Sequence, residues 1–514
     1  MSSKSMCGFP ILTPDEAAQV IHHGDLVGFS GFSAAATPKA VPAAIARKAD
    51  EEHKKGNEFR IRVLTGANGG PTLDEVLAES DALGWRCPYQ SAKLTRERIN
   101  QLKVEYVDMH LSQVAQSISY GFFGEVDCAV VEATEVTADG RLYLTTSIGI
   151  IPTLLQQAKK VIIEINDRQH PRLRELTDVY LIPEPSLRQP LNIRSPLDRI
   201  GADHAQVDPA KIVGVVKTSQ FDRTTPFTPA DSVSEAIAGH VVEFLLSEKR
   251  KGKLPALMPP IQAGVGNIGN AVLAGFDLHP HFPTFFMYTE LIQDSLLDLL
   301  ANEKIKGVSA ASLGTTTAKL LTVFDRMDFF AKRIVLRPSE LSNNPEVIRR
   351  IGVISLNTAI DFDIYGNVNS THFAGTNVMN GIGGAGDYAS NCRMAIFMAP
   401  SIRKDGKISC VVPMCTHVDQ NEHAVHVLVT EQGVADLRGL DPKQRAMCVI
   451  ENCAHPSYRD YLREYVKKSK NAHIPHDLRR AFELYLNFED YGSMLPGVDK
   501  IPVTSKTKAQ AATE

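Results

Sequence analysis

Residues 128–149 read CAVVEATEVTADGRLYLTTSIG, and residues 353–375 read VISLNTAIDFDIYGNVNSTHFAG. Each stretch begins as an apolar strand, passes through a short acidic link and a glycine-containing turn, and ends rich in serine and threonine. The glycine-rich stretches GFSGFSAAATPKAVPAAIA at 28–46 and IQAGVGNIGNAVLAGF at 261–276 form a second similar pair. We therefore predict an internal duplication that produces two α/β halves able to face each other.

The rest of the chain alternates short apolar runs with amphipathic stretches. Strands are predicted at residues 26–29, 61–64, 128–132, 161–165, 212–216, 334–336, 407–413 and 425–430. Helices are predicted at residues 14–22, 38–55, 232–249, 291–301 and 346–351. This interleaving predicts an α/β fold with largely buried sheets. We assign the first half to residues 1–222, the second to 223–500 and a flexible polar tail to 501–514, with the join inside TSQFDRTTPFTPAD at 218–231.

The composition of the 514 residues is that of a globular protein, with 43% hydrophobic and 22% charged residues. Because 55 Lys and Arg face 59 Asp and Glu, the net charge of −4 provides no basic field for nucleic acid. The sequence contains no run of about 18 apolar residues, so no membrane span is predicted. Eight scattered cysteines indicate free thiols in a reducing compartment. With no secretory h-region at the start, we expect a cytoplasmic protein, the alternative being mitochondria or a related organelle if a presequence has been removed.

Two glycine-rich segments are candidates for binding a ligand through the backbone. GVGNIGN at 264–270 could bring helix-opening N–H groups to an anion. Its spacing is not that of a Rossmann motif and no Walker lysine follows, so a tight strand-to-helix turn is an equal alternative. MNGIGGAGDY at 379–388 has four glycines in six residues, more than a plain turn needs, which favours several N–H groups close to a ligand.

Three acidic or polar positions stand near predicted element ends. In YTELIQD at 288–294, Thr289 has the chemistry of a helix N-cap, and Glu290 would lie in the first turn, where the helix dipole stabilises an acid that has no other role. LSNNP at 341–345 is a polar turn before a helix and could equally be only a cap. Glu431 ends an apolar strand, and an acid there either lines a cleft or is solvated.

Other chemistries find no support in the residues. The 16 histidines show no metal-binding spacing, so no metal is expected. A G-x-S-x-G elbow for a hydrolase triad is absent. The lack of a Rossmann fingerprint after a strand also disfavours a nicotinamide dehydrogenase.

Several motifs follow one another in a specific order from about residue 12 to residue 494. They are GFSGFS, IQAGVGNIGNAV, MYTELIQD, LSNNPEVIRR, DIYGNVNSTH, MNGIGGAGDYA, GKISCVVPM, VTEQGVADLRGL and CAHPSYRDYL. Together they resemble the acetyl-CoA hydrolase/transferase family of class I CoA-transferases, which includes succinyl-CoA:acetate and propionyl-CoA:succinate CoA-transferases. The resemblance implies two similar open α/β domains with the active site between them, and a homodimer.

The resemblance also implies that Glu290 is a nucleophile. Its carboxylate would attack the thioester of a short-chain acyl-CoA (succinyl-, acetyl- or propionyl-CoA) and form a glutamyl-CoA thioester that an acceptor acid resolves, with ping-pong kinetics. CoA is then a substrate, and no further cofactor is expected. Because the glutamate must be ionised to attack, we expect a helix N-terminus to favour its carboxylate and the pocket not simply to desolvate it.

Roles for other residues come from the same resemblance. The N–H groups of Val265 and Gly384 would form an oxyanion hole. Asn343 and Glu431 would orient the reacting groups. The residues assigned to binding are Gly264, Val265, Asn380, Gly384 and Lys404 for CoA, and Arg223 for the carboxylate.

Two alternative functions remain open. An acetyl-CoA hydrolase would use the same glutamate and loops, with water intercepting an intermediate. A non-catalytic CoA-binding protein would keep the glycine loops but would not need Glu290 and Glu431 beside them. The expected partners are acyl-CoA and short carboxylic acids, with no nucleic acid and no membrane. The preferred acid is not readable, because acetate, propionate and succinate differ by a few pocket contacts of roughly 1–3 kcal/mol.

Overall fold

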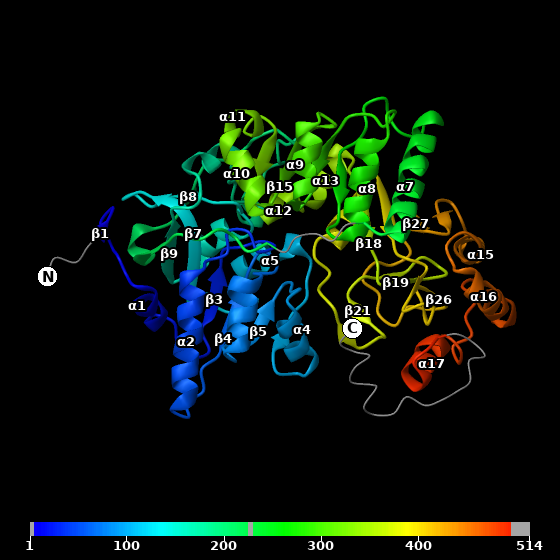
Figure 1. Cartoon of the computed structure of the whole chain (residues 1–514), viewed down its shortest axis with the longest axis horizontal. Helices are drawn as coiled ribbons and strands as arrows, with labels where there is room; N and C mark the ends of the chain where they lie inside the picture. Colours follow the sequence, from blue (N-terminus) through cyan, green and yellow to red (C-terminus); the bar gives the residue numbers. More distant parts are fainter. Residues whose placement is uncertain (1–4, 225–229, 495–514) are drawn as a thin grey trace.

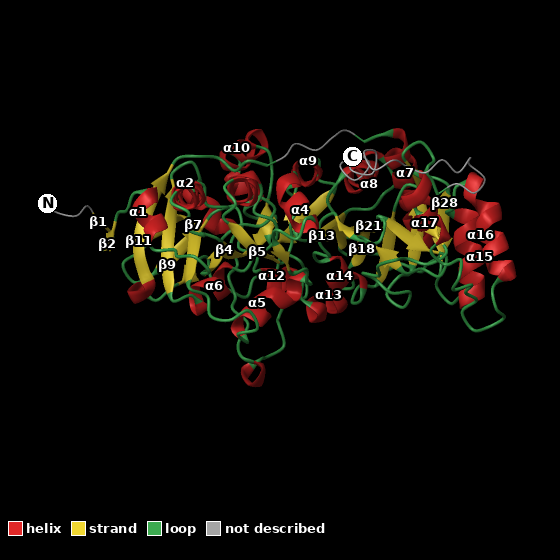
Figure 2. Ribbon diagram, turned by 90° about the horizontal axis from the view of Figure 1, so that it is seen from below, coloured by secondary structure: helices red, strands yellow, loops and turns green. Residues whose placement is uncertain are grey.

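The computed structural model describes residues 5–224 and 230–494. Figure 1 shows the first half of the chain, coloured blue to cyan, beside the second half, coloured green to red. Each half has its own largely parallel sheet. Figure 2 shows helices on both faces of these sheets, the arrangement that buries parallel strands. The predicted α/β fold is confirmed.

The first sheet has nine strands, seven of them parallel. Across the sheet the parallel strands are β6 (Glu105–Tyr106), β5 (Leu83–Cys87), β4 (Ile61–Leu64), β3 (Leu26–Phe29), β7 (Cys128–Val136), β9 (Lys160–Asn166) and β11 (Ile212–Thr218). Two antiparallel strands follow β7, namely β8 (Arg141–Leu144) and β10 (Ala205–Gln206).

The second sheet has eight strands, again with seven parallel. Across the sheet these are β17 (Ile334–Leu336), β15 (Ile305–Ala310), β13 (Phe285–Tyr288), β12 (Ile261–Ala263), β18 (Ile354–Thr358), β23 (Met394–Met398) and β27 (Val427–Thr430). The antiparallel strand β28 (Gly433–Asp436) closes the edge.

The two sheets share one topology. Numbered along the chain, the seven parallel strands lie in the order 4-3-2-1-5-6-7 in both sheets. This common order supports the predicted duplication. In each sheet the order reverses beside strand 1, which is β3 in the first half and β12 in the second. Open α/β sheets bind ligands at such a switch point, outside the carboxyl ends of the strands.

The helices of the first half are α1 (Pro14–Gln19), α2 (Ala40–Lys54), α3 (Val76–Glu79), α4 (Lys93–Asn100), α5 (Leu111–Ser119) and α6 (Ile151–Gln157). Those of the second half are α7 (Ser232–Arg250), α8 (Asn267–Leu278), α9 (Asp294–Ala301), α10 (Thr317–Asp325), α11 (Met327–Phe330), α12 (Ser339–Ser342), α13 (Pro345–Ile351), α14 (Ala385–Ala389), α15 (Pro442–Asn452), α16 (Pro456–Lys468) and α17 (Glu483–Tyr491). Side chains cap several of them. The Asp231 carboxylate, for example, accepts a hydrogen bond from the Ser234 N–H at 2.7 Å at the start of α7.

The remaining strands of the described residues are short. They are β1 (Ser5–Met6), β2 (Phe9–Pro10), β14 (Leu291–Ile292), β16 (Ser312–Leu313), β19 (Asp361–Asp363), β20 (Val368–Asn369), β21 (His372–Phe373), β22 (Asn377–Val378), β24 (Ile402–Arg403), β25 (Ile408–Ser409) and β26 (Val411–Val412).

Backbone hydrogen bonds join the two halves directly. The Leu313 N–H donates to the Thr146 carbonyl at 2.7 Å, and the Ser339 N–H donates to the Gly149 carbonyl at 2.8 Å. One hydrophobic cluster also runs through both halves and contains side chains such as Leu154 from α6. The halves are therefore packed as one body, and side chains from both can share a site.

Two predicted elements differ from the structure in a way that a specific contact explains. The helix predicted at 291–301 begins only at Asp294, because Leu291 and Ile292 pair as β14 with β16. The strand predicted at 407–413 is two short strands, because the Ser409 side chain bonds the backbone of Val411 and turns the chain between them. The other predicted strands and helices are present, with ends shifted by a few residues at most.

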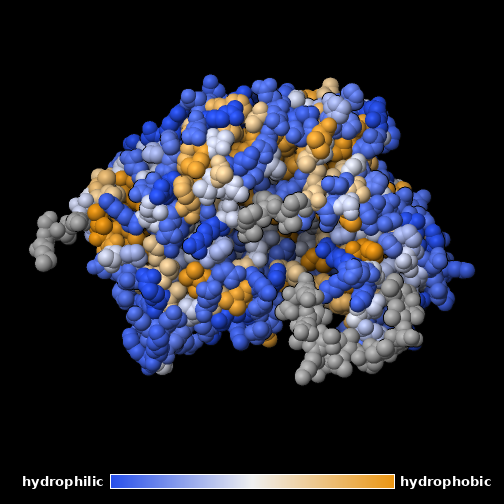
Figure 3. All heavy atoms as spheres, viewed as in Figure 1, coloured by the Kyte–Doolittle hydropathy of each residue, from blue (hydrophilic) through white to orange (hydrophobic). Residues whose placement is uncertain are grey.

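The division at residues 222 and 223 stays a prediction, and the tail predicted at 501–514 lies outside the described residues. Among the residues that the structure describes, no helix is both long and apolar enough to cross a membrane. The face in Figure 3 is mostly hydrophilic, with hydrophobic residues in separate patches.

Candidate active site

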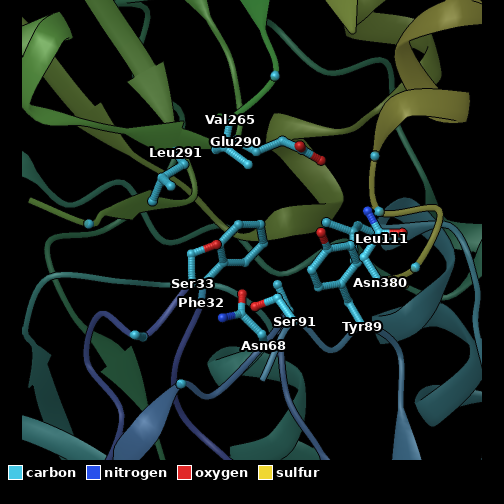
Figure 4. A pocket seen from close by; sticks show the side chains of 18 of the residues that line it. Phe32, Ser33, Asn68, Tyr89, Ser91, Leu111, Val265, Glu290, Leu291 and Asn380 are labelled. Atoms are coloured by element: carbon cyan, nitrogen blue, oxygen red, sulfur yellow. The ribbon is translucent and has the colours of Figure 1, made fainter. Parts of the chain in front are cut away.

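A cavity of about 460 Å³ lies between the two halves. Figure 4 shows its walls: Val265, Glu290 and Leu291 face side chains of the first half, such as Phe32 and Tyr89. The second-half wall follows strands next to the switch point, because residues just after β12 and β13 and at the end of β18 line it. Of the predicted site residues, the cavity brings together Gly264, Val265, Glu290, Asn380 and Gly384.

Glu290 lies in a bend between β13 and β14. Its carbonyl accepts hydrogen bonds from the N–H groups of Ala311 at 2.9 Å and Ser312 at 3.2 Å, which hold the backbone of the bend. Thr289 is not a helix cap: its hydroxyl donates to the Ala263 carbonyl at 3.2 Å and ties the bend to the end of β12. The predicted place of Glu290 in a first helical turn was therefore wrong, since Gln293 is the N-cap of α9.

Asn343 and Gly384 contact the Glu290 carboxylate. The Asn343 Nδ2 donates to Glu290 Oε1 at 2.6 Å. A Cβ atom built on Gly384 would lie 1.7 Å from the same oxygen and 2.1 Å from Asn343 Nδ2, so only glycine fits there. The adjacent Asn344 has a different task, since its side chain caps α13 by accepting from two N–H groups. The alternatives predicted for this turn, site residue and cap, are thus divided between two neighbouring asparagines.

Burial dominates the electrostatics of the nucleophile candidate. Desolvation raises the pKa of Glu290 to about 7, the hydrogen bond from Asn343 lowers it, and the negative charge of Asp387 raises it further. The expectation that a helix N-terminus would favour the carboxylate and outweigh desolvation was therefore wrong. The pKa of Glu290 is raised because the surrounding atoms desolvate its carboxylate, and the residue lies outside the helix.

The loop after β12 presents its backbone to the cavity. The Gly264 N–H donates to the Leu356 carbonyl at 2.8 Å, while Val265, which is 46% exposed, projects into the cavity. Gly266 has a φ of 111°, which favours glycine, and it is the N-cap of α8. Neither the Val265 nor the Gly384 N–H has a protein hydrogen-bond acceptor within residues 5–224 and 230–494. Both are free to donate to a ligand.

The glycines at 381–386 serve close packing. A Cβ on Gly381 would lie 2.5 Å from the Tyr106 hydroxyl, and a Cβ on Gly386 would lie 2.1 Å from a ring carbon of His110. The same loop is held by the first half, because the Asp108 carboxylate accepts from the Ile382 N–H at 2.9 and 3.0 Å. The glycine run therefore lets the second half approach the first as well as Glu290.

Four predicted residues are not among those that line the cavity. One of them is Asn343, which contacts the Glu290 carboxylate, and the other three are Glu431, Lys404 and Arg223. Partial burial works against ionisation of Glu431, but hydrogen bonds from Ser401 and Gln432 prevail and hold its pKa below the ordinary value. Lys404 lies in the β24–β25 turn, with Nζ 6.0 Å from the Phe373 ring centre. Arg223 precedes Thr224, which does line the cavity. The roles assigned to these three residues stay predictions.

Comparison with known proteins identifies the family of this chain. The N-terminal domain of the acetyl-CoA hydrolase/transferase family matches residues 10–217, and its C-terminal domain matches residues 320–466. The chain belongs to this family. It is 51% identical to the propanoyl-CoA:succinate CoA transferase of Escherichia coli K12, over 94% of this chain and 98% of that protein. It is 44% identical to the succinyl-CoA:acetate CoA-transferase of Clostridium kluyveri, over 94% and 90% of the two chains.

Family members with another name are also similar. The acetyl-CoA hydrolase of Saccharomyces cerevisiae is 38% identical over 93% of this chain and 94% of its own. Among solved structures, RipA from Yersinia pestis has a TM-score of 0.67 at 20% identity, covering 89% of this chain and 97% of its own. The 4-hydroxybutyrate CoA-transferase of Porphyromonas gingivalis has a TM-score of 0.60 at 19% identity, with the same two coverages. These two structures show the fold alone.

Sequence reasoning about this family member missed two kinds of residue. Asp387 lies inside a quoted motif, yet its contacts with Asn343 and Ser112 follow only from the tertiary structure. In the first-half wall, Phe32 and Ser33 end the GFSGFS motif but received no role, while Asn68, Tyr89 and Ser91 come from other loops and belong to no motif. Among the described residues, no cluster of His, Cys, Asp and Glu could hold a metal ion.

Proposed function

We propose that this protein is a CoA-transferase that moves CoA between a short-chain acyl-CoA and a carboxylic acid through a glutamyl-CoA thioester on Glu290. The observation that carries the proposal is the Glu290 carboxylate in a cavity between the halves, in contact with Asn343 and Gly384. Its membership of a family with named CoA-transferases at 51% and 44% identity supports the reaction class.

The reaction exchanges bonds of similar energy. The Glu290 carboxylate attacks the thioester carbonyl, CoA leaves as thiolate, and a mixed anhydride between the glutamate and the acyl group forms. The thiolate then attacks the glutamyl carbonyl and releases the first carboxylate, which leaves CoA bound to Glu290 as a thioester. The acceptor carboxylate repeats these two steps in reverse. Each half-reaction consumes and releases one carboxylate, so no proton or redox partner is required.

Each tetrahedral intermediate carries an oxyanion. The proposed donors are the N–H groups of Val265 and Gly384, which come from one loop before Glu290 in the chain and one after it, and both residues line the cavity. Losing one such donor typically costs on the order of 100-fold or more in rate. Asn343 holds the attacking carboxylate by its 2.6 Å hydrogen bond. We assign the CoA path to Gly264, Asn380 and Lys404, the carboxylate entrance to Arg223, and orientation of the reacting groups to Glu431.

The substrates proposed are succinyl-, acetyl- and propionyl-CoA with the matching acids, because similar proteins are named for these compounds. We further propose a homodimer, as the family resemblance implies, and a cytoplasmic location, which the eight free cysteines support. Light scattering of the purified protein and fractionation of the source cells test these two points.

Hydrolysis is the second candidate, because several similar proteins at 36–39% identity are named acetyl-CoA hydrolases. Both reactions need Glu290, and they differ in whether water or a carboxylate resolves the intermediate. CoA release measured with and without an acceptor acid separates them. A release rate that no acceptor changes would favour hydrolysis.

The decisive experiment is intact-protein mass after incubation with acetyl-CoA or succinyl-CoA, followed by peptide mapping. We expect an adduct of CoA mass on Glu290 that disappears when acetate, propionate or succinate is added. Tight CoA binding with neither adduct nor CoA release would contradict catalysis and favour a binding protein.

A further inference from the structure

A buried carboxylate that the proposed reaction does not use lies behind Glu290. Asp387, in α14, is 5% exposed. Its Oδ1 accepts from the Ser112 hydroxyl at 2.6 Å, and its Oδ2 accepts from the Ser112 N–H at 3.0 Å and from Asn343 Nδ2 at 3.3 Å. Burial raises the pKa of Asp387 to about 7, and the three donors that converge on its two oxygens oppose this rise by stabilising the carboxylate.

Asp387 caps a helix that belongs to the other half. Ser112 is the second residue of α5, and the N-cap of that helix, His110, makes no side-chain capping bond. The Ser112 N–H would otherwise be one of the orphan donors at the helix start. Asp387 accepts it across the interface, and the positive end of the helix dipole stabilises the carboxylate. This contact links the two halves directly beside the nucleophile.

The same carboxylate determines how the Asn343 amide is turned. Asn343 Nδ2 donates both to Glu290 Oε1 and to Asp387 Oδ2, while its Oδ1 accepts from the Ser342 hydroxyl at 2.8 Å. Rotating the amide by half a turn would place its oxygen against two carboxylates. Asp387 therefore opposes the orientation in which Asn343 could not donate to Glu290.

We propose that Asp387 is a positioning residue for CoA transfer: fastened to the start of α5, it holds the Asn343 amide so that Nδ2 is presented to Glu290. The inference rests on the proposed role of Glu290 as nucleophile. The titratable groups that face Asp387 are Glu290 itself, the Tyr388 hydroxyl, and His110, whose Nδ1 lies 4.0 Å from Oδ1.

The charge of Asp387 makes the proposal measurable. Burial raises the pKa of Glu290 most, and the negative charge of Asp387 adds to that rise. Activity requires ionised Glu290, so activity falls as pH drops through that pKa. Removing the charge at residue 387 lowers the pKa of Glu290 and moves this acid limb to lower pH.

The test is Asp387→Asn, which keeps the shape of the side chain but removes its charge. We expect kcat to fall about tenfold or more, KM for acyl-CoA to change little, and the acid limb of the kcat profile to move down by about half a pH unit or more. The matched control is Asp441→Asn. Its carboxylate also caps a helix, accepting from the Gln444 N–H at 2.9 Å, but it does not line the cavity. The control should leave both kcat and the acid limb unchanged.

Ser112→Ala is a second variant that keeps the charge of Asp387 but removes one of its donors. We expect kcat to fall a few-fold with KM unchanged. Wild-type kcat in this variant overturns the proposal if Asp387→Asn does not fold. If the acid limb of Asp387→Asn stays at the wild-type pH, the proposal is overturned even when activity falls. A purely structural defect lowers activity without shifting that limb. If the wild-type protein forms no adduct on Glu290, the proposed nucleophile fails instead.

Discussion

The two halves share a strand order but differ in a residue that follows the second parallel strand. After β4 and after β13 comes a threonine, Thr65 or Thr289, whose N–H donates to a carbonyl of the next strand, β5 or β15, at 3.3 and 2.9 Å. These matching bonds make the two threonines structural counterparts. The following residue is Gly66 in the first half and Glu290 in the second. Only the second half therefore carries a carboxylate at this bend.

The opposing glycines correspond as well. Gly149 and Gly384 each precede the helix that leads into the sixth parallel strand, α6 in one half and α14 in the other. A Cβ on Gly66 would lie 3.3 Å from Gly149 Cα, and a Cβ on Gly384 would lie 1.7 Å from Glu290 Oε1. In both halves the glycine loop approaches the bend closely, but only the second half has a carboxylate in the bend.

At the switch point, the end of the fifth parallel strand is buried in the first half, whereas in the second half it lines the cavity. Thr358, at the end of β18, lines the cavity, whereas its counterpart on β7, Glu132, is fully buried in an ion pair with Lys39. Lys39 Nζ also donates to Asp222 at 2.6 Å. One buried ammonium group is therefore shared by two buried carboxylates. The comparison teaches that one copy of the scaffold presents a carboxylate to the cavity and the other supplies the facing wall.

The largest effect is expected from removing the one carboxylate that distinguishes the two bends. Glu290→Gln should fold and bind CoA, yet lose transfer by at least about 1000-fold, because a neutral amide cannot attack the thioester. Acyl exchange between labelled succinate and succinyl-CoA measures the loss, and intact mass should show no adduct. Substantial remaining transfer would refute the assignment.

The second-largest effect on transfer is expected at Gly384, and it should distinguish this glycine from its counterpart Gly149. Gly384→Ala places a methyl group on the Glu290 carboxylate, so transfer should fall by about 100-fold or more. Gly149→Ala meets no atom closer than 3.7 Å but has a φ of 48°, so it should lose about 1 kcal/mol of stability and keep its transfer activity. Parallel thermal melts and kinetic assays provide the comparison. Equal losses of activity would show that the two loops are not functionally distinct.

A third prediction concerns pH. Because the pKa of Glu290 is raised to about 7 and the ionised form attacks, kcat should be constant above neutrality and fall toward tenfold for each pH unit well below 7. The first half has no carboxylate at this bend and adds nothing to this limb. A profile that stays flat down to pH 5 would contradict the desolvated environment of Glu290.

The smallest effect on activity is expected at Gly66. A Cβ there would lie 3.1 Å from the Gly31 carbonyl oxygen and from a ring carbon of Phe32, which is tight but leaves room for small shifts. Gly66→Ala should therefore lose about 1–3 kcal/mol of stability in denaturant titration while kcat stays close to that of the wild type. A loss of kcat as large as that of Gly384→Ala would mean that this bend takes part in the reaction.

Much of the scaffold could be predicted because local pattern and tertiary structure agree. The strands at 26–29, 61–64 and 334–336 were predicted with the bounds that the structure has, since short apolar runs become buried parallel strands. The errors lie where a distant segment intervenes. Leu291 and Ile292 read as helix, but they pair with β16, which is brought beside them by the fold. The helix therefore begins only at Asp294. Glu290 lies outside it, so the argument that the helix dipole stabilises the Glu290 carboxylate does not hold.

The sequence by itself determined the α/β class, the duplicated pattern and the family motif that singles out Glu290, because periodicity and ordered motifs are local properties of the chain. Only the tertiary structure decided what surrounds that glutamate. Asn343 donates to its carboxylate, Gly384 packs against it and Asp387 contacts Asn343, although these residues lie about fifty to a hundred positions further along the chain. Burial in the cavity then raises its pKa, since desolvation depends on the enclosing atoms from both halves and not on the neighbouring residues in the chain.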